Sequence, residues 1–438
     1  YGYHSSAYCN PCTPIKLTSG TSSITNAGTL TKVSGSSGTQ NVNTTSFVNT
    51  GTVSVDSGTL TIGSSGTETD TGTYSMASGA TLNFSGGTRT FNAGTSITGL
   101  GALQVSNGAL NINTGSALTL AGFTISGAAT VNHAYDLNIG SLNVTGAGTV
   151  ATFAGAGGVN LSGASSIEPA GISAATLRID GGKSLTNTNT GSFTFTGFGE
   201  DRHGFAAILS LMNGSNFINA GTVTLRNGTI SPGTGGATSS FTNNGILTSA
   251  AGPYASAWVN GGNNGYGSGA GGTVSANFTN TGALNSAVGT ITLAATGSYT
   301  HSGTFDAASG AGITFGAGTN ALNAITGSGT IGFANASVTT ISGQVNASGL
   351  SISGSAIANL NNTATTNALG AITATGGTLN INNTTLSSGI TSATLSNAAI
   401  VNLNGSATET LTAVSFNAQN YYTNNGYLNN VGVLNIGS

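Results

Sequence analysis

The chain has 438 residues and a formal net charge of −3, and charged residues make up only 4% of it, against about 25% in an average globular domain. Acidic and basic residues are scattered, so there is no basic stripe to neutralise phosphates, and nucleic-acid binding is excluded. No apolar stretch approaches the roughly 20 residues that cross a bilayer, so the chain is not expected to be membrane-spanning.

Residues 1–17 form a first segment, which we expect to cap the repeats that follow or to contact another subunit. An exported chain that starts here without a basic and apolar leader would be in its processed form. The segment contains three tyrosines and a cysteine pair: Tyr1, Tyr3, Tyr8, Cys9 and Cys12. In an exported protein the pair indicates a local or intermolecular disulfide. A metal half-site with His4, or no special role, are the alternatives.

Residues 18–438 repeat one pattern: an apolar residue, Asn two positions later, Gly two positions after that, and a second apolar residue. His301 occupies the Asn position once and is expected to hydrogen-bond there, and Glu68 to Tyr74 is a weaker, polar version of the pattern. The Asn and Gly residues of the clear copies are Asn26 and Gly28, Asn49 and Gly51, Asn219 and Gly221, Asn243 and Gly245, Asn280 and Gly282, and Asn424 and Gly426.

The spacing of these glycines defines a coil of about 21 to 24 residues, as between Gly28, Gly51 and Gly72. A fixed period in this range indicates a solenoid. Further Gly-x-apolar steps about seven residues apart predict three short strands per coil. Alternation such as Thr52-Val53-Ser54-Val55 places every second side chain inside. The predicted fold is therefore all-β, a single elongated parallel β-helix, right-handed by the usual rule for parallel crossovers.

Each position of the repeat has a physical reason. Glycine at a corner accepts positive φ and lets neighbouring coils approach closely. Asparagines stacked on successive coils can bond through their amides as a ladder. Inward apolar columns supply the main driving force, at roughly 25 cal/mol per Å² buried.

Two segments interrupt the period and are expected to project as loops. The first, near residues 199–213, holds several charged residues and the one credible short helix. The second, near 252–272, contains Trp258 and repeated Gly-Gly and Asn-Gly pairs. The coil that contains Asn424 is followed by only a short stretch, and an uncapped solenoid end would present unpaired main-chain groups. A continuation of the chain, a partner protein or the N-terminal end of another copy could cover them.

A carbohydrate-cleaving site would need carboxylates that converge on one face. The one candidate constellation comprises Asp180, Glu200 and Asp201 with Arg178, Lys183, Arg202 and His203, and a solvated loop with local ion pairs is the favoured alternative. Neither His133 nor His301 has a cysteine, a carboxylate or a second histidine at the spacing of a metal site. Thr59 and Thr61 could begin an ice-binding face, but the next coil has Thr81 and Asn83. No catalytic residue, metal or cofactor is predicted.

The stretches Phe47-Val48-Asn49-Thr50-Gly51-Thr52-Val53 and Phe217-Ile218-Asn219-Ala220-Gly221-Thr222-Val223 resemble the repeats of large bacterial exoproteins of the filamentous-haemagglutinin and autotransporter-passenger type. The likeness covers nearly the whole chain after about Thr18. It implies a β-helix of surface adhesins and extracellular fibres.

The expected function is therefore that of an extracellular structural or adhesive protein at the bacterial surface, and not of an enzyme. We expect copies to stack end to end as a filament or biofilm matrix, with host or cell-surface glycans as further partners. The alternative is a β-helix protein that binds or cleaves polysaccharides. Aromatic residues of the ends and of the second loop are the candidates for assembly contacts: Tyr1, Tyr3, Tyr8, Trp258, Tyr421, Tyr422 and Tyr427.

Overall fold

The computed structural model describes most of the chain between residues 12 and 436. The described ranges are 12–16, 20–35, 37–170, 173–200, 203–252, 270–361, 368–382, 389–404, 408–411, 413–416, 427–430 and 433–436. Within them the fold is all-β, a parallel β-solenoid of about 16 turns with three strands per coil and no helix. This confirms the predicted fold class. The chain divides into two compact units, residues 1–192 with 212–215 and residues 193–211 with 216–438, and each is treated separately below.

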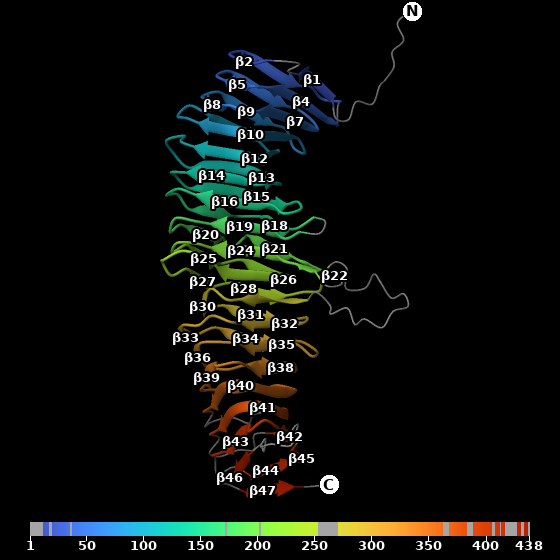
Figure 1. Cartoon of the computed structure of the whole chain (residues 1–438), viewed down its shortest axis with the longest axis vertical. Helices are drawn as coiled ribbons and strands as arrows, with labels where there is room; N and C mark the ends of the chain where they lie inside the picture. The colour runs from blue at the N-terminus through green and yellow to red at the C-terminus, as the bar shows by residue number, and fades with distance from the viewer. Residues whose placement is uncertain are drawn as a thin grey trace, which may run out of the picture. The chain divides into compact units, whose positions relative to one another are not determined.

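In unit 1, each side of the coil is a file of strands paired in parallel from one coil to the next (Figure 1). Long strands bend at a corner and serve two files, so β10 pairs through residues 81–85 in the first file and through 88–91 in the second. The first file comprises β1 (Cys12–Lys16), β4 (Thr39–Thr44), β7 (Thr59–Ser64), β10 (Thr81–Phe91), β12 (Ala102–Ile112), β13 (Leu118–Ile125), β15 (Leu137–Thr145) and β18 (Ala164–Glu168).

The other two files of unit 1 complete its coils. The second file comprises β2 (Ser23–Asn26), β5 (Ser46–Asn49), β8 (Thr67–Asp70), the later parts of β10 and β12, β14 (Ala129–His133), β16 (Val150–Ala154) and β19 (Ala175–Ile179). The third comprises β3 (Thr29–Lys32), β6 (Thr52–Val55), β9 (Thr73–Met76), β11 (Ser96–Gly99), the earlier parts of β13 and β15, β17 (Val159–Leu161) and β20 (Ser184–Asn187).

Unit 2 has the same arrangement of three files, and β21 (Ser192–Thr196) begins it. Its first file comprises β24 (Ala207–Leu211), the later part of β26 (Thr222–Pro232), β29 (Gly271–Val274), β32 (Thr290–Leu293), β35 (Gly312–Phe315), β38 (Thr330–Phe333), β40 (Gly349–Leu360), β41 (Gly370–Ile381), β42 (Ile390–Leu395) and β45 (Ala413–Phe416).

The second file of unit 2 comprises β25 (Asn216–Asn219), β27 (Ser240–Asn243), β30 (Asn277–Asn280), β33 (Ser298–His301), β36 (Thr319–Leu322), β39 (Val338–Ile341), the later parts of β40 and β41, β43 (Ile400–Leu403) and β46 (Tyr427–Asn430). The third comprises the earlier part of β26, β28 (Ile246–Ser249), β31 (Ala283–Ser286), β34 (Thr304–Ala307) and β37 (Thr326–Gly327). β44 (Thr408–Leu411) pairs with β47 (Val433–Ile436).

The predicted helix in the loop near 199–213 is wrong. β22 (Phe198–Glu200) and β23 (His203–Phe205) form an antiparallel hairpin, and β24 then pairs in parallel with β26. β24 alternates buried and half-buried residues, as a strand of the stack does. The run from Phe205 to Met212 was ambiguous because a short apolar stretch fits a strand as well as a helix. Of the second predicted loop, Gly271 already belongs to β29, and residues 253–269 lie outside the described ranges.

The interior of each unit is filled by the inward residue of every second strand position. In unit 2, Phe217, Phe241 and Phe278 occupy one column on successive coils, with ring centroids 4.8 and 5.1 Å apart. All three rings are buried. Columns of this kind remove large apolar areas from water with each added coil, which is what drives the stack to form.

Candidate functional site

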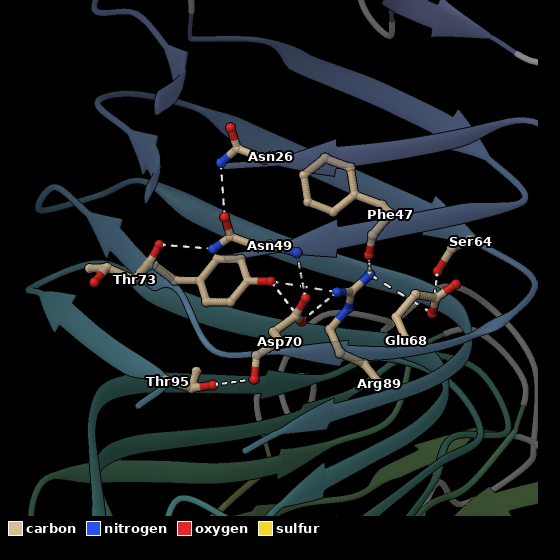
Figure 2. A network of polar contacts seen from close by, with 10 residues as sticks. Asn26, Phe47, Asn49, Ser64, Glu68, Asp70, Thr73, Arg89 and Thr95 are labelled. Atoms are coloured by element: carbon tan, nitrogen blue, oxygen red, sulfur yellow. Dashed lines mark hydrogen bonds and ion pairs between the residues drawn. The ribbon is translucent and has the colours of Figure 1, made fainter. Parts of the chain in front are cut away.

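The asparagine ladder of unit 1 joins its first coils through side-chain amides. Asn26 Nδ2 donates to Asn49 Oδ1 at 2.8 Å and to the Thr52 carbonyl at 2.9 Å. Asn49 Nδ2 in turn donates to the Thr73 carbonyl at 3.1 Å (Figure 2). Asn49 is fully buried. The Asn26 amide therefore links its coil both to the next amide and to the main chain just after the corner, and the Asn49 amide links its coil to the main chain of the following one.

Unit 2 contains a second ladder of the same design. Asn219 Nδ2 donates to Asn243 Oδ1 at 2.7 Å, and Asn243 Nδ2 donates to Asn280 Oδ1 at 2.8 Å. Asn219 and Asn243 also donate to the carbonyls of Ile246 and Ala283 on the following coils. The structure thus brings these three predicted ladder residues together inside the unit. Asn424 and Gly426 lie outside the described residues.

The ladder glycines are needed for close approach between coils. A Cβ at Gly51 would lie 2.7 Å from the Ala27 carbonyl carbon and closer still to the Gly28 carbonyl oxygen. Gly245 and Gly282 meet the preceding coil in the same way. The φ angles of these three glycines are not in the left-handed region. Positive φ, the other predicted reason for glycine, therefore does not apply at these corners.

The unit 1 ladder ends at a carboxylate. β8 places Asp70 at the ladder position and Glu68 at the inward position that Phe47 holds one coil earlier. The Asn49 main-chain N–H donates to Asp70 Oδ1 at 2.7 Å, and the Tyr74 hydroxyl donates to Asp70 Oδ2 at 2.8 Å (Figure 2). A side chain of the next coil thus accepts the hydrogen bond from the last asparagine's main chain.

Arg89 holds this ladder end together. It pairs with Glu68 in the register of β10 and β8, and its guanidinium donates to Asp70 Oδ2 and, at 3.1 Å, to the Phe47 carbonyl (Figure 2). It lies 3.9 Å from Glu68 Oε2 and 4.5 Å from the ring centroid of Phe84. One buried cation therefore contacts three successive coils.

The cluster has one carboxylate more than it has cations. Ser64 Oγ donates to Glu68 Oε2 at 3.0 Å, whereas Glu68 Oε1 is buried without a hydrogen-bond partner. Burial raises the pKa of Glu68, and the Asp70 charge adds to the rise, while Ser64, Arg89 and the Phe47 main chain oppose it. Burial therefore opposes ionisation of the Glu68 carboxyl.

The unit 2 ladder ends at His301, in the position that the repeat gives to Asn. The Asn280 main-chain N–H donates to His301 Nδ1 at 3.1 Å, and His301 Nε2 lies 3.3 Å from Asn320 Oδ1. His301 is buried. In both units, therefore, an acceptor side chain of the next coil takes the main-chain N–H of the last asparagine.

A second buried ionisable pair lies in unit 1, where Lys183 Nζ is 2.9 Å from His133 Nε2 and His133 Nδ1 is 2.9 Å from the Tyr135 carbonyl. Burial lowers the pKa of His133 to about 4 and that of Lys183 to about 8. The Asp180 charge partly opposes the fall for Lys183. At neutral pH a neutral imidazole therefore accepts a hydrogen bond from an ammonium group.

The predicted carboxylate constellation is only partly described. Asp180 Oδ1 accepts a hydrogen bond of 2.6 Å from Asn213, and Arg178 is exposed on β19. Lys183 lies inside with His133, so it does not join Asp180 on the surface. The main chains of Glu200 and His203 are partners in the β22–β23 hairpin, and Asp201 and Arg202 lie outside the described residues.

Most predicted assembly residues also lie outside the described part of the chain. Cys12 is in β1 and Tyr427 is in β46, each placed by its main chain. Outside the described ranges are Tyr1, Tyr3, Tyr8, Cys9, Trp258, Tyr421 and Tyr422.

The cluster around Arg89 was missed by sequence reasoning, although a signal for it exists. Arg89 follows Glu68 by one coil length of 21 residues, and Glu68 and Asp70 fill an inward and a ladder position of the repeat. Two acids and a base at inward positions of neighbouring coils predict a buried ion pair, because buried charges require partners.

Within the described ranges, His, Cys, Asp and Glu nowhere gather in a group of three that could hold a metal ion. A search of the described residues for helices long and apolar enough to cross a membrane finds none. Comparison with protein-family models, curated proteins and solved structures finds no match.

Proposed function

We propose that this chain is an extracellular structural or adhesive protein of a bacterial surface, whose copies associate into a filament or matrix and which catalyses no reaction. The proposal combines the solenoid fold with the nature of its outward positions. The contacts of the Arg89 cluster, of His301 and of the Lys183–His133 pair all join one coil to another, which supports a structural role for them. The surface is then the part of the molecule through which it would act.

The observation that carries the proposal is a column of hydroxyl side chains on the first file of unit 2. Its residues occupy one register position on successive coils, interrupted once by Gly332. They are Thr229, Thr273, Thr292, Thr314, Ser351, Thr373, Thr394 and Ser415. These side chains are half-buried or exposed. We call this set the hydroxyl column.

A surface of this kind suits contact between copies. It is uncharged, so two copies would meet there with little repulsion, and it presents hydroxyl groups on successive coils, interrupted only at Gly332. The outer strand of any parallel stack also offers unpaired main-chain groups, which favours end-to-end stacking of copies. The hydroxyl and amide groups could equally bind cell-surface glycans, which is the adhesive form of the proposal.

Electron microscopy and sedimentation of the purified chain test the proposal. Filaments or large assemblies are expected for the native protein. Lysines at Thr314 and Thr373 should shorten or abolish them, because each would place a charge in the hydroxyl column. The matched control puts lysines at Thr300 and Thr340, which are outward positions of the second file. Uniform monomers at all concentrations would refute self-association, and glycan-binding assays would then test adhesion.

A further inference from the structure

The boundary between β30 and β33 in unit 2 depends on a histidine. The Asn280 main-chain N–H bonds to His301 Nδ1, whereas the carbonyl of Asn280 accepts hydrogen bonds from the main-chain N–H groups of Ser302 and Gly303 at 3.1 and 3.0 Å. Parallel strands normally exchange such bonds between main chains. At this boundary one of them is made by a group that can titrate.

The hydrogen bonds around His301 fix its protonation state. Asn320 Nδ2 donates to the Ala317 carbonyl at 3.2 Å, which turns Asn320 Oδ1 toward His301 Nε2. An amide oxygen requires a donor, so the imidazole proton belongs on Nε2. Nδ1 is then unprotonated and accepts from Asn280. Only the neutral Nε2–H tautomer satisfies both contacts.

The surroundings give a protonated imidazole no counter-ion among the described groups. The rings of Phe278, Phe305 and Tyr299 lie 5.7, 5.3 and 6.4 Å from that of His301. Burial raises the pKa of Tyr299, so its hydroxyl stays neutral and donates to Asn277. Asp306 of the neighbouring β34 is on the outward side and accepts a hydrogen bond from Thr326.

We propose that His301 is a pH-sensitive joint of unit 2, which is closed while its imidazole is neutral and loosens the boundary between β30 and β33 when the imidazole is protonated. Protonation would turn Nδ1 into a donor that faces the Asn280 N–H and would place an unpaired charge in the interior. The proposal is independent of the function proposed above, because it concerns contacts within one unit.

The direction of the pH dependence follows from burial. Burial lowers the pKa of His301 below the ordinary value of 6.5. The unfolded chain therefore binds more protons than the folded chain between the two values, and stability is lost as the pH falls through the folded pKa. The joint is thus closed at neutral pH and loosens only in acid.

Amide hydrogen exchange of the full chain tests the proposal at residue level. In the native protein the protection of the Asn280 amide, corrected for intrinsic rates, should fall about tenfold or more once His301 is protonated. The Asn243 amide, which lies in the same ladder, is the internal control and should keep its protection. His301→Asn restores the residue of the repeat. In this variant the Asn280 amide should stay protected at neutral pH and at the acidic pH at which His301 of the native protein is protonated.

Either of two hydrogen-exchange results would overturn the proposal. One is an unchanged Asn280 protection while His301 is protonated, and the other is the same acid loss in His301→Asn. Nitrogen-15 NMR of the native imidazole gives a test that needs no variant. The Nε2–H tautomer at pH 7.5 supports the joint, and a proton on Nδ1 contradicts it.

Discussion

The ladder glycines allow a sharp test of how the coils pack, because one column contains both a crowded and an open position. A Cβ at Gly51 would lie 2.7 and 2.8 Å from the Ala27 carbonyl carbon and the Gly28 nitrogen, whereas a Cβ at Gly28 would have nothing within 4 Å. Both residues follow a ladder asparagine. Gly51→Ala and Gly28→Ala are therefore a matched pair.

The structure sets the expected size of the difference. Overpacking costs about 1–3 kcal/mol, and Gly51→Ala should reach about 3 kcal/mol because the atoms it meets are main-chain atoms that cannot rotate away. For a unit of about 150–250 residues this corresponds to a fall in Tm of about 6–12 °C. Gly28→Ala should be neutral, or stabilise by about 0.4–1 kcal/mol through the unfolded chain.

Thermal unfolding followed by far-ultraviolet circular dichroism measures both variants. Hydrogen exchange of peptides that cover residues 46–55 should show the loss in Gly51→Ala and not in Gly28→Ala, while unit 2 peptides remain as in the native chain. Equal melting temperatures for the two variants would refute close approach as the reason for glycine at this corner.

Three further predictions concern the buried ionisable groups of unit 1. Because the raised pKa of Glu68 means that the folded state binds the proton more tightly, native stability should rise as the pH falls through that pKa. Glu68→Gln should remove this rise in a series of urea titrations from pH 7 down to the ordinary glutamate pKa of 4.5, and a rise of the same size in the variant would contradict the assignment. Arg89→Met leaves Asp70 and Glu68 buried without a cation and should cost about 3–5 kcal/mol. The triple variant Glu68→Phe, Asp70→Asn and Arg89→Leu should recover most of that loss in the same urea assay, because it restores the repeat, and failure to recover would show that the ladder cannot continue here. NMR titration should find His133 neutral down to about pH 4. Lys183→Met should raise the pKa of His133, because the neighbouring positive charge is gone. An unchanged His133 titration in this variant would show that the Lys183 charge does not act on His133.

The fold could be predicted from the sequence because the same pattern of apolar, asparagine and glycine positions recurs in many coils. Phe47, Asn49 and Gly51 each have an equivalent residue in the coils of unit 2, so a single correct interpretation of one motif applies to all of them. The segment near 199–213 offered no such redundancy. Its apolar run fits two secondary structures, and only the pairing of β24 with β26 distinguishes them.

The geometry of the ladder ends is harder to predict than the fold, because Asp70 and His301 look like errors in the pattern. Asp70 reads as a weak copy of the asparagine position, and its role appears only when Arg89 is placed beside it. His301 was expected to hydrogen-bond at the asparagine position, and it does, but its partner Asn320 lies 19 residues later, at no position that the Asn-Gly motif marks. Periodicity predicts which coils are neighbours, but not how a side chain reaches across the boundary between them.

The two ladder ends show why a ladder cannot simply stop inside a solenoid. The last asparagine still has a main-chain N–H that points toward the next coil, and a buried N–H without an acceptor costs about 1–3 kcal/mol. Unit 1 supplies a carboxylate at that point and unit 2 an imidazole. A carboxylate carries a charge, so it also needs Arg89, whereas a neutral imidazole needs only the Asn320 amide. The choice of acceptor therefore decides whether a ladder end must bury an ion pair or can respond to acid.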